Sequence, residues 1–349
     1  MNIVGNDGNS QLLIVAFRLS KEEEITLSIM RTLALILCVV FNAAFVHAQN
    51  FKYSFKESYE VATPAKLDLT SFDGELEVTT GSGNKIEVYY IVRKQGQFIA
   101  MDRATLEEKI VLETDNGSNY VSILVKDKPE KNFANRNRIS VAFKVYVPKY
   151  TECILTTSDG DVKIGGLTGN QQIKTSDGKI NVSNISGNIF GKTSDGDIGI
   201  NDIAGDVEIK TSDGNIHIQD VDGNLLATTS DGNISINKLK GDVSVRTSDG
   251  FIEFNDVTGS FSGSTSDGNI NGSFASLKKS LNLKTSDGNI DVTIPGQLGL
   301  DLDIRGESIN APLQNFSGKA EKDRIQGKSN GGGIPVILST SGGRVKIVY

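Results

Sequence analysis

The stretch TSDGKINVSNISGNIFGK at residues 175–192 is followed without interruption by TSDGDIGINDIAGDVEIK at residues 193–210. Both begin with Thr-Ser-Asp-Gly, and this tetrapeptide occurs eight times in the chain. Its aspartates are 18 residues apart six times in succession and then 20 apart: Asp159, Asp177, Asp195, Asp213, Asp231, Asp249, Asp267 and Asp287. Self-similarity at a fixed period indicates a repeat architecture, in which each unit buries its apolar side chains against its neighbours.

Apolar residues occupy fixed columns within each period. One column follows the turn glycine by two residues, and a second column comes two residues later. A spacing of two is strand periodicity, and the columns are mostly β-branched, which favours strands over helices. Asp-Gly and a second glycine column mark turns. The first column holds Val162, Ile180, Ile198, Ile216, Ile234, Ile252, Ile270 and Ile290, and the second holds Ile164, Val182, Ile200, Ile218, Ile236 and Phe254.

A period of 18 residues is too short for a propeller blade or a leucine-rich repeat, and it suits one rung of a β-helix. We therefore predict an all-β fold, a single-stranded β-helix (β-solenoid) of 18-residue rungs with an irregular β-rich N-terminal cap. Rungs stacked about 4.8 Å apart pair each strand with its copies above and below, so about ten rungs give a stack roughly 50 Å long. The 20-residue step at residues 273–277 predicts a bulge at one corner.

The flanks of the repeat are less regular. Residues 49–150 are predicted to start and cap the solenoid, which then occupies residues 151–349 and ends in degenerate rungs. Within the cap, alternation predicts strands at 66–69, 85–88 and 141–145, residues 102–110 suit a short helix, and Ser71-Phe72-Asp73-Gly74 is a degenerate copy of the turn. Residues 315–333 are polar and rich in glycine, which predicts a loop.

The N-terminus predicts export. Arg31, an apolar run at 33–41 and the small-residue site ending at Ala48 have the order of a secretory signal peptide at residues 30–48. Residues 1–29 are then an extension upstream of a true start at Met30. A lipoprotein cysteine at Cys38 and an uncleaved anchor are the weaker alternatives. The expected location is the periplasm, the cell surface or the extracellular space, with no membrane span in the mature chain.

The net charge and the few Cys and His residues limit the kinds of partner and site that the chain can have. A net charge of −7 argues against nucleic acid as a partner, because phosphate binding needs a basic face. After cleavage at Ala48, Cys153 is the one remaining thiol, so it cannot form an internal disulfide, and we expect it to be a buried structural residue. His217 lies between two column residues and is expected to point outward.

The stacked aspartates are the most conspicuous polar feature and a candidate ligand-facing ladder. The structural interpretation is that each Asp accepts a local backbone N–H while its Gly takes the left-handed conformation. The alternative is a Ca²⁺ site, although Ca²⁺ needs six to eight oxygens and each turn supplies one carboxylate. We otherwise expect no cofactor. Basic residues three positions earlier would offset the repulsion between stacked carboxylates. The candidate ladder is Asp177, Asp195, Asp213, Asp231 and Asp249 with Lys174, Lys192, Lys210 and Arg246.

The repeated Thr-Ser-Asp-Gly-x-Ile-x-Ile units from Thr157 onward, with the closing segment at residues 337–347, resemble the bacterial adhesin family of the DUF4097 type and related DUF2807-like β-helix proteins. The resemblance covers roughly Leu67 to Tyr349. It implies a β-solenoid exposed to the envelope or the exterior, and it brings no catalytic residues with it.

The leading functional hypothesis is an exported, non-catalytic binding or structural module that contacts an envelope or surface glycan or polymer. Small polar outward positions such as Asn181, Ser235, Asn271 and Asn289 suit such contacts. The alternative is a regulatory scaffold that senses envelope stress by binding a protein partner. A polysaccharide-active enzyme is less consistent with the sequence, because the central rungs lack cleft-building insertions and have Phe190 and Phe251 as their outward aromatics.

Overall fold

The structure is a computed structural model that describes residues 51–128 and 139–349. The expected upstream extension (1–29) and signal peptide (30–48) lie outside the described residues. Residues Lys52–Tyr349 form one compact unit. Within the described ranges, α2 (Arg103–Lys109) is the one helix and all other regular elements are strands, so the all-β prediction is confirmed.

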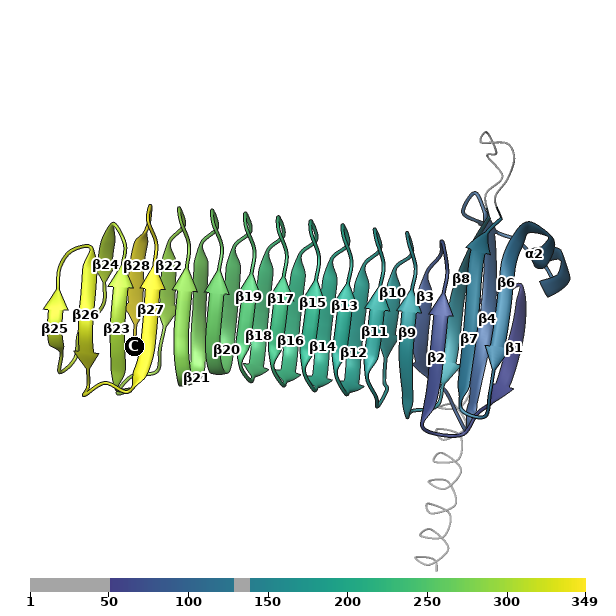
Figure 1. The fold of residues 1–349 in the computed structure, drawn as a ribbon, viewed down its shortest axis with the longest axis horizontal. Coiled ribbons are helices and arrows are strands. Elements are labelled where there is room, and N and C mark those ends of the chain that lie inside the picture. Colours follow the sequence, from purple (N-terminus) through teal and green to yellow (C-terminus); the bar gives the residue numbers. More distant parts are fainter. Residues whose placement is uncertain (1–50, 129–138) are drawn as a thin grey trace, which may run out of the picture. The chain divides into compact units, whose positions relative to one another are not determined.

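Two rows of parallel strands, joined at each rung by the tetrapeptide turn, build the solenoid (Figure 1). Residues 18 apart lie opposite each other, as Ile180 does to Ile198. The first row precedes the turns and contains β2 (Ala65–Thr70), β9 (Thr151–Thr156), β11 (Gln171–Lys174), β13 (Ile189–Lys192), β15 (Val207–Lys210), β17 (Leu225–Thr228) and β19 (Val243–Arg246). The second row follows the turns and contains β3 (Leu76–Thr80), β10 (Val162–Gly165), β12 (Ile180–Ser186), β14 (Ile198–Ala204), β16 (Ile216–Asp222) and β18 (Ile234–Lys240).

The core lies between the two rows. Each residue of the two predicted apolar columns is buried, which confirms the column assignment; Ile180, Ile198 and Ile216 have no exposed surface. Full burial of an Ile or Val side chain stabilises a fold by about 1.5–3 kcal/mol. A single rung leaves these side chains open above and below, and therefore the stack supplies most of this stabilisation.

The N-terminal cap closes one end of the stack. Strands β2 and β3 already form a rung, since they pair in parallel with β9 and β10. On their other side lie β7 (Tyr120–Asp127) and β8 (Ile139–Val147). Beyond these, the pairing turns antiparallel, and α2 lies where a helix was predicted, with Asp102 as its N-cap. The outer strands are β1 (Phe55–Glu60), β4 (Lys85–Lys94), β5 (Gln97–Phe98) and β6 (Ile110–Asn116).

The C-terminal end departs from sequence order. The long strands β20 (Ile252–Ser264) and β21 (Ile270–Lys284) pair with register shifts, which confirms the bulge predicted for the 20-residue step. The last rung, β27 (Ile334–Ser339) and β28 (Arg344–Val348), lies between β21–β22 (Ile290–Thr293) and β23–β24 (Leu300–Arg305 and Ser308–Asn310).

The prediction of a loop at residues 315–333 is wrong. This segment contains β25 (Ser317–Ala320) and β26 (Arg324–Ser329), which pair as an antiparallel hairpin, and β26 in turn covers the edge of β23. The polar composition concealed the strand because the hairpin buries little apolar surface; Ile325 and Ser329 are its buried side chains. The exposed edge that β23 would otherwise present explains why a strand forms here.

Candidate functional site

The turn edge consists of the eight Thr-Ser-Asp-Gly tetrapeptides that begin at Thr157. In each described turn from Thr175 onward, the buried threonine hydroxyl accepts a hydrogen bond from the glycine N–H of its own turn and lies against carbonyls of the preceding rung. For Thr211, the hydroxyl oxygen lies 3.3 Å from the Gly214 nitrogen, 3.0 Å from the Ser194 carbonyl and 3.1 Å from the Gly196 carbonyl. The threonine hydroxyl, and not the aspartate carboxylate as predicted from the sequence, therefore accepts the local backbone N–H of the turn.

The turn glycines are required for a different reason from the one predicted. From Gly160 onward they are not in the left-handed conformation, which among the turn copies belongs only to Gly74 with φ +115°. Instead, the turns stack so closely that a Cβ on Gly214 would lie 1.9 Å from the carbonyl oxygen of Gly196. The same distance of 1.9 to 2.0 Å recurs from Gly160 to Gly288. Close approach of backbones, not backbone conformation, excludes every other residue.

The aspartates of the predicted ladder form an exposed row of carboxylates along the turn edge. Asp177, Asp195 and Asp213 are exposed, and their carboxylates make no hydrogen bond or ion pair within residues 51–128 and 139–349. Lys174, Lys192 and Lys210 stack opposite one another on the first row of strands. No ion pair in the described ranges joins these lysines to the ladder, so direct pairing does not offset its repulsion. The described residues contain no group of three or more His, Cys, Asp or Glu side chains arranged to hold a metal ion.

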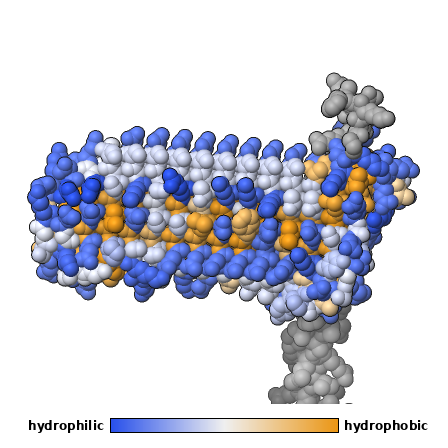
Figure 2. Space-filling view, in the orientation of Figure 1, coloured by the Kyte–Doolittle hydropathy of each residue, from blue (hydrophilic) through white to orange (hydrophobic). Residues whose placement is uncertain are grey.

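A groove runs along the outward side of the first row, across β9, β11, β13, β15, β17 and β19. It has a volume of about 670 Å³ and was not predicted from the sequence. Apolar side chains line it in alternate rungs: Ile154, then Phe190, then Leu226, the last two 37% and 46% exposed. Figure 2 shows an interrupted apolar band along the stacked strands. The rungs between carry Gln172 and Glu208 at the same register position. We call this surface the groove face.

A row of Asn and Asp side chains forms one border of the groove face. In Asn188, the Oδ1 atom accepts a hydrogen bond from the backbone N–H of Asp206, one rung further on, at 3.0 Å. Asn170 and Asn224 make the same bond to Asn188 and Asp242. This bond uses the amide oxygen and leaves the amide N–H₂ groups of these asparagines exposed along the groove.

The second row of strands carries a smaller hollow of about 390 Å³, whose outward side chains are polar. Asn181, Ser235 and His217 line it, so the predicted outward orientation of His217 is confirmed. Asn237 donates to Gln219 at 2.8 Å, which continues a row of amide side chains across rungs.

Cys153 is buried at the first-row end of the stack, and desolvation raises the pKa of its thiol. A thiol with a raised pKa is a poor nucleophile. The prediction of a buried, structural cysteine is therefore confirmed.

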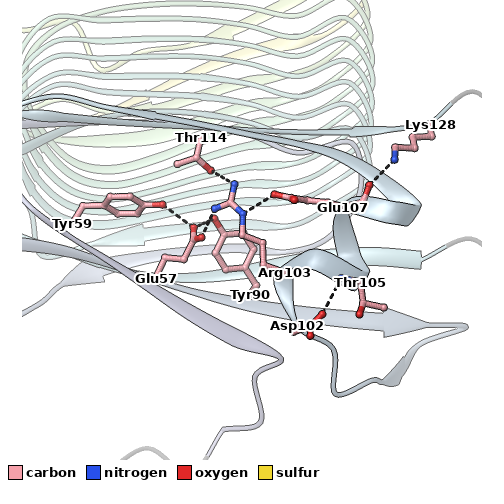
Figure 3. A network of polar contacts seen from close by, with 9 residues as sticks. All are labelled: Glu57, Tyr59, Tyr90, Asp102, Arg103, Thr105, Glu107, Thr114 and Lys128. Carbon is pink, nitrogen blue, oxygen red and sulfur yellow. Dashed lines mark hydrogen bonds and ion pairs between the residues drawn. The ribbon is translucent and has the colours of Figure 1, made fainter.

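A network in the N-terminal cap surrounds the carboxylate of Glu57 (Figure 3). Tyr59 and Tyr90 each donate to it at 2.7 Å, and Arg103 of α2 forms an ion pair with it. Burial raises the pKa of Glu57, but the hydrogen bonds from Tyr90, Tyr59 and Arg103 outweigh it and hold that pKa below its ordinary value. Burial and Glu57 raise the pKa of Tyr59 to about 12. The network fastens α2 onto β1 and β4.

Sequence reasoning missed both the groove face and this network. The groove face was detectable in principle, because Ile154, Phe190 and Leu226 fall on outward strand positions at a spacing of 36 residues. The Glu57 network was not, because its members lie far apart in a region without repeats.

The chain is similar, at low sequence identity, to several solved bacterial structures. No curated protein matches the chain. A structure from Bacteroides fragilis described as a "putative adhesin" is 16% identical, with 68% of this chain and 96% of that chain covered and a TM-score of 0.37. One of the same description from Parabacteroides distasonis is 12% identical, covering 70% and 98%, with a TM-score of 0.37. A "Putative lipid binding protein" from the same species is 13% identical, covering 84% and 96%, with a TM-score of 0.30.

No helix within the described residues is long and apolar enough to cross a membrane.

The family model described as Toastrack DUF4097 matches residues 65–252 and again 191–348, which together span the rungs and the turn edge from β2 to β28. The chain therefore belongs to the Toastrack DUF4097 family.

Proposed function

We propose that this protein is an exported, non-catalytic binding module of the cell envelope or surface, and that the groove face holds its partner. The observation that carries the proposal is the groove itself. It is a concave surface across six rungs with a volume of about 670 Å³, and Phe190 and Leu226 are exposed within it. Concave surfaces lined by apolar side chains and a few polar groups are the common form of binding sites. A solenoid extends such a surface along its whole stack.

One carboxyl group of the groove, that of Asp242, is unsuited to act as a general acid. A general acid in a glycosidase needs a raised pKa. At Asp242, which lines the groove, the hydrogen bond from Lys279 lowers the pKa instead, and Ser260 adds to that effect. The Lys279 ammonium lies 2.6 Å from this carboxylate and holds it ionised.

The turn-edge ladder is the second candidate surface for the same function. Its exposed, unpaired carboxylates would contact a cation or a basic partner. The groove face is preferred because apolar surface supplies most of the free energy of binding, whereas exposed charges supply little.

A retention assay tests the proposal. The purified protein is passed over immobilised envelope fractions and a panel of polysaccharides, with Ca²⁺ or with EDTA. We expect saturable retention that Phe190→Ser with Leu226→Ser abolishes and that EDTA leaves unchanged. Phe251→Ser, which removes an equally exposed aromatic outside the groove, serves as the matched control. Retention on no fraction would overturn the proposal and favour a purely structural scaffold.

A further inference from the structure

We infer that the turn edge is a self-association surface, through which two copies of this protein bind each other with two-fold symmetry. Two parallel rows of opposite charge carry the inference: the carboxylates of the turn aspartates and a row of basic side chains beside them. The inference does not rest on the groove face, whose apolar side chains take no part in this surface. It accounts for the repetition of the aspartates, which no contact of their carboxylates within the described residues explains.

The turn aspartates form a row of one sign along the turn edge, and we call this row the carboxylate ladder. In Figure 2 the turn edge is the upper margin of the stack, with evenly spaced hydrophilic tips. The positions directly after the turn glycines include one basic residue, Lys179, whose ammonium lies 3.1 Å from Asp197, outside the ladder. The ladder therefore keeps its negative charge. It consists of Asp159, Asp177, Asp195, Asp213, Asp231, Asp249, Asp267 and Asp287.

A second column runs parallel to the ladder, on the first-row strands three residues before it. Register places its positions opposite one another from β9 to β27, and each of them is Lys, Arg, Ser or Thr. Its cations are exposed and form no ion pair within the described ranges; we call them the basic row. The basic row consists of Lys174, Lys192, Lys210, Arg246 and Lys284, with Thr156, Thr228, Ser264 and Ser339 at the other positions of the column.

The carboxylates near the basic row leave most of its charge in place. Two residues earlier on the same strands lie Gln172, Phe190, Glu208, Ser244 and Asn282, among which Glu208 is the one acid. Beyond the groove, Asp206 and Asp242 follow, and Asp242 pairs with Lys279 at 2.6 Å. Exposed serines such as Ser194 separate the basic row from the carboxylate ladder, and no ion pair joins the two rows within residues 51–128 and 139–349. The turn edge thus presents a positive and a negative stripe side by side.

Two-fold symmetry makes such a surface complementary to itself. In an isologous contact, one patch of a protein meets the same patch on a second copy. A two-fold axis that runs along the stack, or that stands upright on the turn edge, exchanges the two sides of that edge. The basic row of each copy then faces the carboxylate ladder of the other, and every contact is between opposite charges. The residues between the rows are serines, so no bulky side chain holds the two edges apart.

A partner of another kind satisfies only one of the two rows. A polyanion such as an acidic glycan would be attracted by the basic row and repelled by the ladder, and a polycation would meet the converse. A divalent cation would use the ladder alone, and the described residues contain no group of carboxylates arranged to hold one. A second copy presents both signs of charge at once. The opposite signs of the two rows, and not the spacing of the rungs, select this partner.

The strength of the contact follows from its exposure. Exposed ion pairs are individually weak, and salt screens them. We therefore expect dilute protein to be monomeric and association to appear as the protein concentration rises at low salt. The stability of the dilute protein is then a property of the single stack.

Sedimentation velocity of the purified protein over a concentration series tests the inference. We expect a monomer–dimer equilibrium in about 20 mM salt and association at least tenfold weaker in about 500 mM salt. Lys192→Glu with Lys210→Glu and Arg246→Glu makes both rows negative and should weaken association at least tenfold. The matched control, Lys149→Glu with Lys240→Glu and Lys278→Glu, makes the same change in net charge at exposed positions near the other end of the strands. It should stay within threefold of the wild type.

A mixing experiment tests the pairing of the two rows. Asp195→Lys with Asp213→Lys and Asp249→Lys makes both rows positive. Alone, this variant and the one with two negative rows should each be monomeric, whereas their mixture should form a heterodimer at least as tight as the wild-type homodimer. Circular dichroism of each variant checks its fold. Should a reversed variant not fold, Asp195→Asn with Asp213→Asn and Asp249→Asn takes its place and should weaken self-association at least threefold.

Four results would overturn the inference: a wild type that stays monomeric at low salt, a control that loses association as the basic-row variant does, a mixture of folded reversed variants without heterodimer, and wild-type association that EDTA abolishes. The last would mean that a metal ion joins the carboxylates. None of these results bears on retention by the groove face, so the proposed function stands or falls separately.

Discussion

The turn edge and the groove face share the period of 18 residues but use it in opposite ways. At the turn edge, Thr, Ser, Asp and Gly recur in rung after rung, and the threonine hydroxyl and the missing glycine Cβ each fit the backbone of the preceding turn. On the groove face, the residue at one register position changes from Ile154 to Gln172 to Phe190 to Glu208 to Leu226.

A repeat protein can thus use one set of positions for folding and another set for binding. Positions that contact the next rung are restricted to what stacks, so they repeat. Outward positions that contact no neighbouring backbone are free to vary with the partner. The recurring Thr and Gly of the tetrapeptide are therefore explained by the fold, whereas no described contact of the recurring Asp carboxylates explains their repetition. The interruptions of the repeat mark the candidate site.

The largest expected effect is at the turn edge. In Gly214→Ala, the new methyl group would lie 1.9 Å from the Gly196 carbonyl, so two rungs must separate. We expect a loss of about 3 kcal/mol in the free energy of unfolding, measured by urea denaturation. Gly296→Ala, where the nearest atom is 4.0 Å away, is the control and should be close to neutral. Equal stability of both variants would mean that the turns do not stack as described.

The second effect concerns the threonine hydroxyl. Thr211→Val keeps the shape of the side chain and leaves the Gly214 N–H without its acceptor in a buried turn. We expect a loss of about 2 kcal/mol, because a buried donor without a partner costs about 1–3 kcal/mol. Thr211→Ser, which retains the hydroxyl, should recover most of it. If Val and Ser prove equally stable, the hydroxyl contributes nothing.

The Glu57 network stabilises the N-terminal cap through contacts that occur once, in contrast to the turn contacts that recur in every rung. Glu57→Gln should lower the free energy of unfolding by about 1 kcal/mol at pH 7, since it weakens hydrogen bonds to a charged group. The folded pKa of Glu57 lies below the ordinary value of 4.5, so its contribution is complete above that value and is lost as the pH falls through the folded pKa. Denaturation curves of both proteins should therefore converge in acid. A difference that grows as the pH falls would contradict this assignment.

The smallest expected effect on stability is at the carboxylate ladder. Asp195→Asn, Asp213→Asn and Asp231→Asn together remove like charges from exposed side chains that make no described hydrogen bond; the backbone N–H of each residue keeps its bond to the preceding turn. We expect a change within about 0.5 kcal/mol, with a slight gain at low salt that disappears at high salt. A large loss of stability would restore the predicted role of these aspartates in the turn.

The rung architecture could be predicted from the sequence because columns such as Ile180, Ile198 and Ile216 repeat the same physical signal. The role of Thr211 could not, because Asp and Thr both suit turns and only the stacked backbone shows which side chain is buried. The C-terminal hairpin was missed because few of its side chains are apolar. The groove face was not predicted because the residue at its register position differs from rung to rung and therefore gives no repeating signal.

The central claim is that the turn edge builds the fold and the groove face binds the partner. Its most direct test compares the retained fraction of two variants on the same envelope preparation: Asp195→Asn with Asp213→Asn and Asp231→Asn, and Phe190→Ser with Leu226→Ser. Both are expected to fold with wild-type unfolding midpoints. We expect the ladder variant to be retained like the wild type and the groove variant not to be retained. Loss of retention in the ladder variant, with normal retention of the groove variant, would contradict it.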